Sequence, residues 1–317
     1  MNSLIIPVYK NLENIPSLLA ALKELDRQIA NLEVVFVVDG SPDSSASLLT
    51  QLLPASGLRA QLLLLSRNFG SYAAIRAGLI AARGERFAVM AADLQEPPEL
   101  VTTFFTVLES EPVDIVIATR ELRADPFLSR LASNMFWKLY KKFVVPEMPE
   151  GGVDVFACNL TFRNNLLQLD ESHSSLVALL FWMGFRRKVV SYTRLARLHG
   201  KSAWTFKKKY IYFKDSIFSF TDAPIKLLSW IGTLGILFSV MMALIVLLGR
   251  LTGWVNVPGY SATVLTIIFF GALNLLGLGI IGTYAWRTYE NTKRRPSALV
   301  MTQIVFFATK PNHQGPS

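Results

Sequence analysis

The stretch Phe87–Glu99, FAVMAADLQEPPE, decides the fold of this chain. An apolar run from Phe87 to Ala92 stops at Asp93, and two prolines then precede an amphipathic stretch. Short apolar runs are typical of buried strands, and proline is tolerated in the first turn of a helix. Open α/β sheets bind ligands at the carboxyl ends of their strands. The segment therefore predicts a buried strand that places Asp93 in a ligand cleft.

Strand-like and helix-like stretches alternate through the first 120 residues. Five short apolar runs are candidate strands: Ser3–Val8, Glu33–Val38, Gln61–Leu65, Phe87–Ala92 and Ile115–Ala118. The stretches between them carry apolar residues at i, i+3 and i+4 and predict helices at Ile15–Ile29, Ser44–Leu53, Tyr72–Ala82 and Glu99–Leu108. This alternation, with fully apolar strands, predicts an α/β fold with a mostly parallel sheet and helices on both faces.

Polar residues lie at the end of each of the five predicted strands. In chain order these are Pro7 and Tyr9; Asp39, Gly40 and Ser41; Ser66, Arg67, Asn68 and Gly70; Asp93 and Gln95; and Thr119 and Arg120. Each set alone has a structural explanation, such as a turn or the start of a helix. Five sets at the same edge of one sheet favour a ligand cleft.

The motifs of several ligand classes are missing from the sequence. The first 120 residues, which carry the five candidate strands, contain no GxGxxG, the whole chain contains no GxxxxGK[ST] and no GxSxG, and one cysteine provides no zinc cluster. The carboxylate of Asp93 and the amide oxygen of Gln95 suit a hard cation, Mg²⁺ or Mn²⁺, that bridges a diphosphate. Asp39 is placed to bond a ribose or base. Together these residues predict a nucleotide-diphosphate donor.

Two long uncharged segments, Leu227–Leu248 and Ser261–Trp286, lie in the second half of the chain. Hydrophobic residues make up 51% of the chain, and the mean hydropathy is positive. As helices the segments would measure about 33–39 Å, enough to cross a hydrocarbon core of about 30 Å. Two consecutive segments of this length disfavour the alternative of buried core helices. The sequence predicts two transmembrane helices within residues 225–288.

The net charge of +9 is concentrated beside these segments. The basic residues that flank the two segments are Lys207, Lys208, Lys209, Lys214 and Lys226 before the first and Arg287, Lys293, Arg294 and Arg295 after the second. The connecting loop carries only Arg250. By the positive-inside rule, the protein is multi-pass in the inner membrane with both termini cytoplasmic. The charge then indicates topology and contact with anionic lipids, not nucleic-acid binding.

The remaining segments complete the domain prediction. Residues 206–224 carry flanking lysines and apolar residues at three- or four-residue spacing, which predicts an amphipathic helix in the membrane interface. The apolar run Leu299–Ala308 predicts a returning strand within a cytoplasmic tail, residues 289–317. Residues 1–205 form the predicted catalytic domain. The lone Cys158 excludes an intrachain disulfide framework and fits a reducing cytoplasm. Glycines in the second apolar segment allow close helix packing or a homo-oligomer.

Four segments carry a family resemblance: IIPVYKNLENI at residues 5–15, VVDGSPD at 37–43, SRNFGSYAAIRAGLIAARG at 66–84 and AADLQEPPEL at 91–100. They resemble family 2 glycosyltransferases with a GT-A fold, and among these the polyprenyl-phosphate glycosyltransferases. That group includes dolichyl-phosphate mannose synthases and the bactoprenol glucosyltransferases of lipopolysaccharide O-antigen modification. The resemblance covers nearly the whole chain, because the bactoprenol enzymes also end in two transmembrane helices.

The resemblance implies an inverting, metal-dependent transfer of a hexose from a nucleotide sugar to undecaprenyl phosphate, with UDP-glucose as the default donor. It also implies roles for residues. The nucleotide sugar is assigned to Pro7, Tyr9, Asp39, Asp93, Gln95 and Lys201; the metal to Asp93 and Gln95; the acceptor phosphate to Arg120, Arg130 and Asn134; and the catalytic set to Asp93, Asp154, Arg120 and Arg130. Asp154 belongs to the segment Gly151-Gly152-Val153-Asp154, and Lys201 to the basic loop His199–Ser202.

The sequence departs from the family pattern at three places. Ala91 replaces the first acid of the usual DADLQ, Asp154 is followed by Val155-Phe156-Ala157 instead of the usual Phe-Arg-Leu, and Lys10-Asn11 replaces a glutamate. Two other functions remain open. A processive polysaccharide synthase shares the core but carries a QxxRW motif, which is missing from this sequence. A non-catalytic membrane scaffold or flippase partner would explain the missing acid at position 91.

Overall fold

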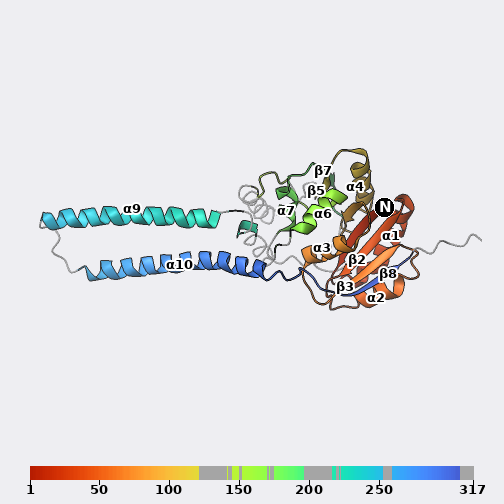
Figure 1. Ribbon diagram of the computed structural model, residues 1–317, viewed down its shortest axis with the longest axis horizontal. Helices are drawn as coiled ribbons and strands as arrows, with labels where there is room; N and C mark the ends of the chain where they lie inside the picture. The colour runs from red at the N-terminus through yellow and green to blue at the C-terminus, as the bar shows by residue number, and fades with distance from the viewer. Residues whose placement is uncertain are drawn as a thin grey trace, which may run out of the picture. The chain divides into compact units, whose positions relative to one another are not determined.

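The computed structural model describes residues 1–120, 141, 145–149, 152–169, 171, 175–195, 216–218, 221, 223–252 and 259–307. The chain divides into two compact units (Figure 1). One comprises Met1–Lys209 with Arg295–Ser317, and the other comprises Tyr210–Arg294.

The first unit is built on a sheet that has eight strands within the described residues, in the order β7-β5-β6-β4-β1-β2-β3-β8. The strands are β1 (Asn2–Val8), β2 (Leu32–Val38), β3 (Ala60–Leu65), β4 (Arg86–Val89), β5 (Ile115–Arg120), β6 (Val155–Asn159), β7 (Arg187–Tyr192) and β8 (Val300–Phe306). The β1–β2, β1–β4, β2–β3 and β5–β7 pairs are parallel. Strands β6 and β8 run antiparallel to their neighbours. The predicted α/β fold with a mostly parallel sheet is confirmed.

The four helices predicted in the first 120 residues are present, each within two residues of its expected borders. The helices of this unit are α1 (Ile15–Gln28), α2 (Ser45–Leu52), α3 (Ser71–Ala81), α4 (Glu99–Ser110), α6 (Leu160–Gln168) and α7 (Leu176–Trp182), with a short 3-10 helix at Leu12–Asn14. Helix α1 buries the periodic leucines Leu18, Leu22 and Leu25. Periodicity predicts these elements well because one face of each helix must be buried against the sheet.

The two faces of the sheet are covered by different helices. Leu4, Ile6 and Phe36 join one core cluster with residues of α1, α2 and α4. On the other face, α3 lies close to β1 and β2 because Gly78 has no side chain: a Cβ there would lie 2.4 Å from Cγ2 of Ile5. The sheet is therefore covered on both faces, as parallel sheets usually are.

The C-terminal strand β8 returns to the first unit and pairs antiparallel with β3, which confirms the predicted returning strand. Gln303 Nε2 donates to Gln61 Oε1 at 2.8 Å, and Gln61 Nε2 donates to Glu33 Oε1 at 2.9 Å. The buried Glu33 also accepts from Ser3 Oγ at 2.8 Å. A buried carboxylate is expensive unless hydrogen-bonded, and this one is bonded on both oxygens. The C-terminal segment thus forms part of the sheet of the first unit.

The second unit contains the helices α9 (Ala223–Leu251) and α10 (Tyr260–Thr292), which run beside each other (Figure 1). They touch at Gly277, where an added Cβ would lie 3.5 Å from Leu228 Cδ1. Among the described residues one segment, Phe269–Thr292 in α10, is long and apolar enough to cross a membrane. The prediction of two transmembrane helices is therefore not confirmed. Most of the predicted interfacial helix at 206–224 lies outside the described residues.

Candidate active site

The strand directions bring four functional side chains to one edge of the sheet. Asp93 follows β4 and Arg120 ends β5, both at carboxyl ends. Because β6 is antiparallel to β4 and β5, its amino end meets the same edge, and Asp154 directly precedes it. Tyr192 ends β7 and stands opposite Arg120 in the parallel β5–β7 register. Because β6 runs in the opposite direction, its amino end adds the side chain of Asp154 to an edge that otherwise consists of the C-terminal ends of parallel strands.

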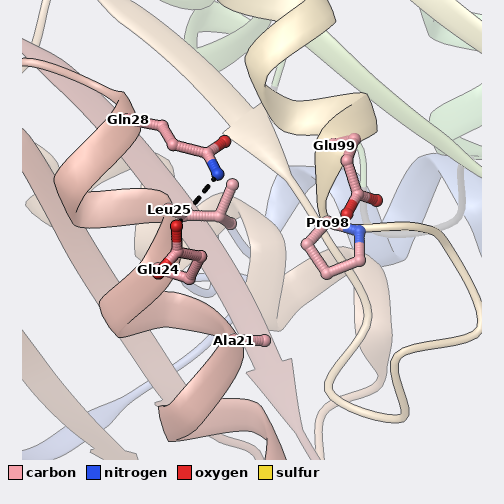
Figure 2. A pocket seen from close by; sticks show the side chains of 6 residues that line it. All are labelled: Ala21, Glu24, Leu25, Gln28, Pro98 and Glu99. Carbon is pink, nitrogen blue, oxygen red and sulfur yellow. Dashed lines mark hydrogen bonds between the residues drawn. The ribbon is translucent and has the colours of Figure 1, made fainter.

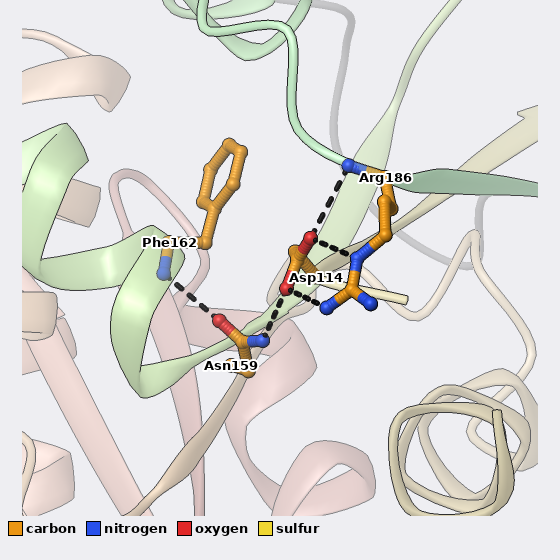
Figure 3. Close-up of polar contacts among 4 residues, drawn as sticks. All are labelled: Asp114, Asn159, Phe162 and Arg186. Atoms are coloured by element: carbon orange, nitrogen blue, oxygen red, sulfur yellow. Dashed lines mark hydrogen bonds and ion pairs between the residues drawn. The ribbon is translucent and has the colours of Figure 1, made fainter. Parts of the chain in front are cut away.

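A polar cluster at the opposite edge fixes the register of these strands (Figure 3). Asp114 accepts hydrogen bonds from Arg186 Nε at 2.9 Å, from Arg186 Nη2 at 3.0 Å and from Asn159 Nδ2 at 2.9 Å. Asn159 Oδ1 in turn accepts from the backbone N–H of Phe162 at 2.8 Å and caps α6. The bonds from Arg186 hold the pKa of Asp114 below its ordinary value. Asp114 thereby joins the strands that carry Arg120, Asp154 and Tyr192.

Two side chains contact the Oδ2 atom of Asp154. The Arg120 Nε atom lies 2.8 Å from Asp154 Oδ2 in an ion pair. The Tyr192 hydroxyl donates to the same oxygen at 2.7 Å. Burial raises the pKa of the Tyr192 phenol, and the Asp154 carboxylate raises it further. Tyr192 is therefore a hydrogen-bond donor across the physiological pH range, and the Asp154 side chain lies between this hydroxyl and the Arg120 guanidinium.

The loop after β4 presents Asp93 and Gln95 through an unusual backbone turn. Leu94 has φ = +53°, a left-handed conformation that is uncommon for a residue with a branched side chain. Its side chain packs against the main core cluster, which offsets the strain of the turn. Asp93 Oδ1 lies 3.4 Å from the Gln95 backbone nitrogen in a long hydrogen bond. The Gln95 side-chain oxygen accepts from Arg194 Nη2 at 2.6 Å.

Glu96 is a third carboxyl group at this edge, and it is 3% exposed. Burial raises the pKa of Glu96 to about 7, and the negative charges of Asp93 and Asp154 raise it further, whereas Arg194 opposes the shift. The charges of Asp93 and Asp154 act on Glu96 because the three carboxyl groups lie at the same edge of the sheet. Among the described residues, three buried atoms here have no hydrogen-bond partner: Glu96 Oε2, Arg120 Nε and Arg194 Nε.

The carboxyl ends of β1 and β2 lie at the same edge of the sheet as the carboxyl end of β4. The buried Asp39 accepts from the backbone N–H of Phe69 at 2.7 Å and of Gly70 at 2.9 Å, one bond on each carboxylate oxygen. Gly40 has φ = +54°, and a Cβ there would lie 2.2 Å from the Arg67 carbonyl carbon. Asp39 thus holds the loop at residues 66–70 against β2. Its predicted contact with a nucleotide stays a prediction, as do those of Pro7 at the end of β1 and Tyr9 after it.

Three predicted site residues, Arg130, Asn134 and Lys201, lie outside the described residues, as do Gly151 and His199–Ser202. The structure also shows a hollow lined by Ala21, Glu24, Leu25 and Gln28 of α1 and by Pro98 and Glu99 at the start of α4 (Figure 2). None of the predicted site residues lines it. The described residues of the predicted site lie at the strand ends and not in this hollow.

The sequence is similar to one known protein family and to several curated proteins. The model of glycosyl transferase family 2 matches residues 3–203. The chain belongs to this family. The putative glycosyltransferase CsbB of Bacillus subtilis is 35% identical, covering 94% of this chain and 90% of its own. A prophage bactoprenol glucosyl transferase homolog of Escherichia coli is 28% identical, covering 94% and 97%.

Among solved structures, this glycosyltransferase aligns with glucosyl-3-phosphoglycerate synthase from Mycobacterium tuberculosis, crystallised with Mn²⁺ and UDP-glucose. The identity is 14% and the TM-score 0.49, over 69% of this chain and 77% of that chain. A similarity of this size carries no argument about the site, which has to be argued from the residues of this chain.

The side chains that could bind a metal ion in this glycosyltransferase form only part of a metal site. Within the described residues no group of three or more His, Cys, Asp or Glu side chains is arranged to hold a metal. Asp93 offers a carboxylate, Gln95 already accepts a bond from Arg194, and Ala91 contributes no ligand. Mg²⁺ is commonly bound by one or two carboxylates together with substrate phosphates and water. The site fits a cation that takes most of its ligands from a bound diphosphate.

Three residues of the site, Glu96, Tyr192 and Arg194, were missed by sequence reasoning. Glu96 directly follows Gln95 in the segment on which the site prediction rests, and this adjacency is the signal that could have identified it. Strand β7, Arg187–Tyr192, begins with two basic residues and has a mixed burial pattern, so it lacks a clear strand signal. Without that strand, nothing in the sequence brings Tyr192 or Arg194 to the edge of the sheet.

Proposed function

We propose that this glycosyltransferase transfers a hexose, glucose by default, from a nucleotide-diphosphate sugar to a polyprenyl phosphate, with inversion at the anomeric carbon. The observation that carries the proposal is the pairing of Asp154 with Arg120 and Tyr192 beside the Asp93 loop. Support comes from relatives named bactoprenol glucosyl transferase, which match over nearly their full lengths at 28–29% identity. Undecaprenyl phosphate is the acceptor that these names suggest.

The chemistry of the acceptor explains why the site needs cations more than a base. A phosphate monoester has a second pKa of about 6, so it is largely dianionic at neutral pH and attacks without losing a proton. Two anions must nevertheless approach each other. Arginine binds phosphate oxygens in bidentate fashion, and Arg120 keeps N–H donors beyond the Nε that faces Asp154. We assign the acceptor phosphate to Arg120, with Arg130 and Asn134, and the orientation of the phosphate or sugar to Asp154.

The nucleotide-sugar donor is assigned to the residues that follow β4, β1 and β2 at the same edge of the sheet. Asp93, with Gln95, would hold a divalent cation, Mg²⁺ or Mn²⁺. When bound, such an ion neutralises the charge that develops on the leaving diphosphate. We assign the nucleoside to Asp39, Pro7 and Tyr9 and to the loop at residues 66–70 that Asp39 holds. Lys201, in the basic loop His199–Ser202, is assigned to the donor as well. Asp93 therefore serves the leaving group, while Asp154 serves the attacking group.

A lipid acceptor also explains the apolar second unit. Helices α9 and α10 expose large hydrophobic side chains, among them Trp230, Phe238 and Leu275, each more than half exposed. Exposed apolar surface of this extent marks contact with a membrane or a partner. We propose that both helices cross the inner membrane, that residues 206–224 lie in its interface near anionic lipids, and that residues 1–205 and 289–317 are cytoplasmic.

The test is a panel of labelled nucleotide sugars incubated with membranes that contain the protein and with added undecaprenyl phosphate. A chloroform-soluble labelled sugar is the expected product. An insoluble polymer would instead indicate a processive synthase, and no product with any donor would indicate a non-catalytic membrane component. Asp93→Ala should remove transfer, whereas Glu109→Ala, which changes an exposed carboxylate on α4, should leave it intact. Mass spectrometry of the lipid then identifies the sugar.

A further inference from the structure

The segment Tyr192–Leu195 begins at the last residue of β7 and contacts residues of both halves of the proposed site. We call it the β7 exit segment. Exposure alternates along the chain here: Ser191 and Thr193 are exposed, Tyr192 is buried and Arg194 is half-buried. Alternating exposure is the pattern of an extended chain, in which residues two apart lie on the same side. Tyr192 and Arg194 therefore face the site together.

The contacts of the β7 exit segment reach two different loops. Tyr192 donates its hydroxyl to Asp154 Oδ2 at 2.7 Å. Two residues later, Arg194 donates to the Gln95 side chain at 2.6 Å, and the Leu195 backbone N–H donates to the Gln95 carbonyl oxygen at 2.9 Å. Gln95 is thus held at both its side chain and its backbone. One short segment connects the loop assigned to the donor with the carboxylate assigned to the acceptor.

These contacts are well suited to orient groups and poorly suited to react. The Tyr192 side chain is 6% exposed, and its pKa is raised, so its hydroxyl donates and does not ionise. Hydrogen bonds to a charged acceptor are stronger than those between neutral groups. A carboxylate held by Tyr192 and Arg120 on one oxygen keeps its other oxygen, Oδ1, in a defined direction. Such supporting contacts set the geometry of a site without touching the substrate.

We propose that Tyr192 and Arg194 are positioning residues of the transfer reaction, Tyr192 for Asp154 and Arg194 for the Gln95 loop. The inference rests on the proposed function and extends it to two residues with separate kinetic consequences. Asp154 acts on the group that attacks, so loss of the Tyr192 hydroxyl reduces turnover. The Gln95 loop binds the donor, so loss of Arg194 weakens donor binding. The β7 exit segment links Asp154 to the Gln95 loop because Tyr192 and Arg194 belong to one extended piece of chain.

The experiment measures kcat and the donor KM for the full-length protein with undecaprenyl phosphate and the donor that the panel identifies. Tyr192→Phe should lower kcat about tenfold with little change in donor KM, the effect expected for losing one hydrogen bond to a charged group. Arg194→Ala should raise the donor KM by about tenfold, and Arg194→Lys, which can still donate to Gln95, should recover most of it. Ser191→Ala, on the opposite side of the strand, is the matched control.

Three results bear on the inference, and thermal unfolding of each variant accompanies the kinetics. The expected split between kcat and KM, with unchanged midpoints, supports it. Wild-type kinetics for Tyr192→Phe and Arg194→Ala would overturn it while leaving the proposed function standing. Parallel losses of kcat and thermal stability in both variants, without rescue by lysine, would overturn it in favour of a merely structural role. Wild-type protein that transfers no sugar refutes the proposed function itself, which is a different readout.

Discussion

Replacing Glu96 by glutamine should change how the stability of this glycosyltransferase depends on pH. The carboxyl group is almost fully buried, and its pKa is raised from an ordinary 4.5 to about 7. Between these two values the folded protein keeps a proton that the unfolded chain has released. A folded-state pKa above the unfolded one means that stability is greatest at low pH and falls as the pH rises toward 7.

The size of the effect follows from the width of that window. One pKa unit corresponds to about 1.4 kcal/mol, so wild-type protein should lose about 2 kcal/mol of unfolding free energy between pH 5 and pH 7 from this group alone. Glutamine has no proton to lose. Glu96→Gln should therefore match the wild type near pH 5 and exceed it by about 2 kcal/mol near pH 8, roughly 4–8 °C in midpoint for a domain of this size.

The assay is thermal unfolding of the full-length protein in detergent at pH 5, 6, 7 and 8, with EDTA present so that no metal ion alters the charge near Asp93. The quantity of interest is the difference between variant and wild type, because other groups titrate equally in both. Glu109→Gln, at an exposed position on α4, is the matched control and should give no pH-dependent difference. Parallel pH profiles for Glu96→Gln and wild type would refute the shared-carboxylate electrostatics described for this site.

Three further substitutions test the framework that positions the site, each by chemical or thermal unfolding. Asn159→Ala removes both the cap of α6 and a bond to Asp114, and should cost about 1–2 kcal/mol; an unchanged midpoint would contradict the role of this cluster. Gly78→Ala gains about 1 kcal/mol in helix propensity but forces a Cβ against Ile5, which costs about 1–3 kcal/mol. A net loss of unfolding free energy is therefore expected, and a stabilised variant would show that α3 can shift. Asp114→Asn should remove a contribution that exists above the ordinary carboxyl pKa of 3.8 and is lost as the pH falls below it; stability curves of variant and wild type should converge in acid, and a constant gap would argue against the Arg186 pairing.

The sequence predicts the first half of the sheet well because its pattern is local. Strand β2 is buried throughout and reads as an apolar run, and α1 shows its buried leucines at helical spacing. Asp93 is predictable for the same reason: it directly follows an apolar run. The strand ends therefore identify one side of the cleft without any knowledge of packing.

The other side of the cleft depends on contacts between residues far apart in the chain. Arg194 meets Gln95 across 99 positions, and Tyr192 meets Asp154 across 38. Those contacts exist because β6 runs antiparallel between β4 and β5, and no local pattern announces that reversal. Asp39 shows the converse. Its ligand contact, suggested by its place at a strand end, stays a prediction, but no local pattern shows that its two oxygens bond the backbone of the neighbouring loop.

The most direct test of the central claim compares wild type with Asp154→Asn in the purified full-length protein. Both are given undecaprenyl phosphate, a labelled donor and Mg²⁺ or Mn²⁺, and the lipid product is quantified by mass spectrometry. The account predicts a polyprenyl phosphate hexose from the wild type and at least about a hundredfold less from the variant, with equal thermal stability. Undiminished product from Asp154→Asn would contradict the assignment of this carboxylate to the reaction.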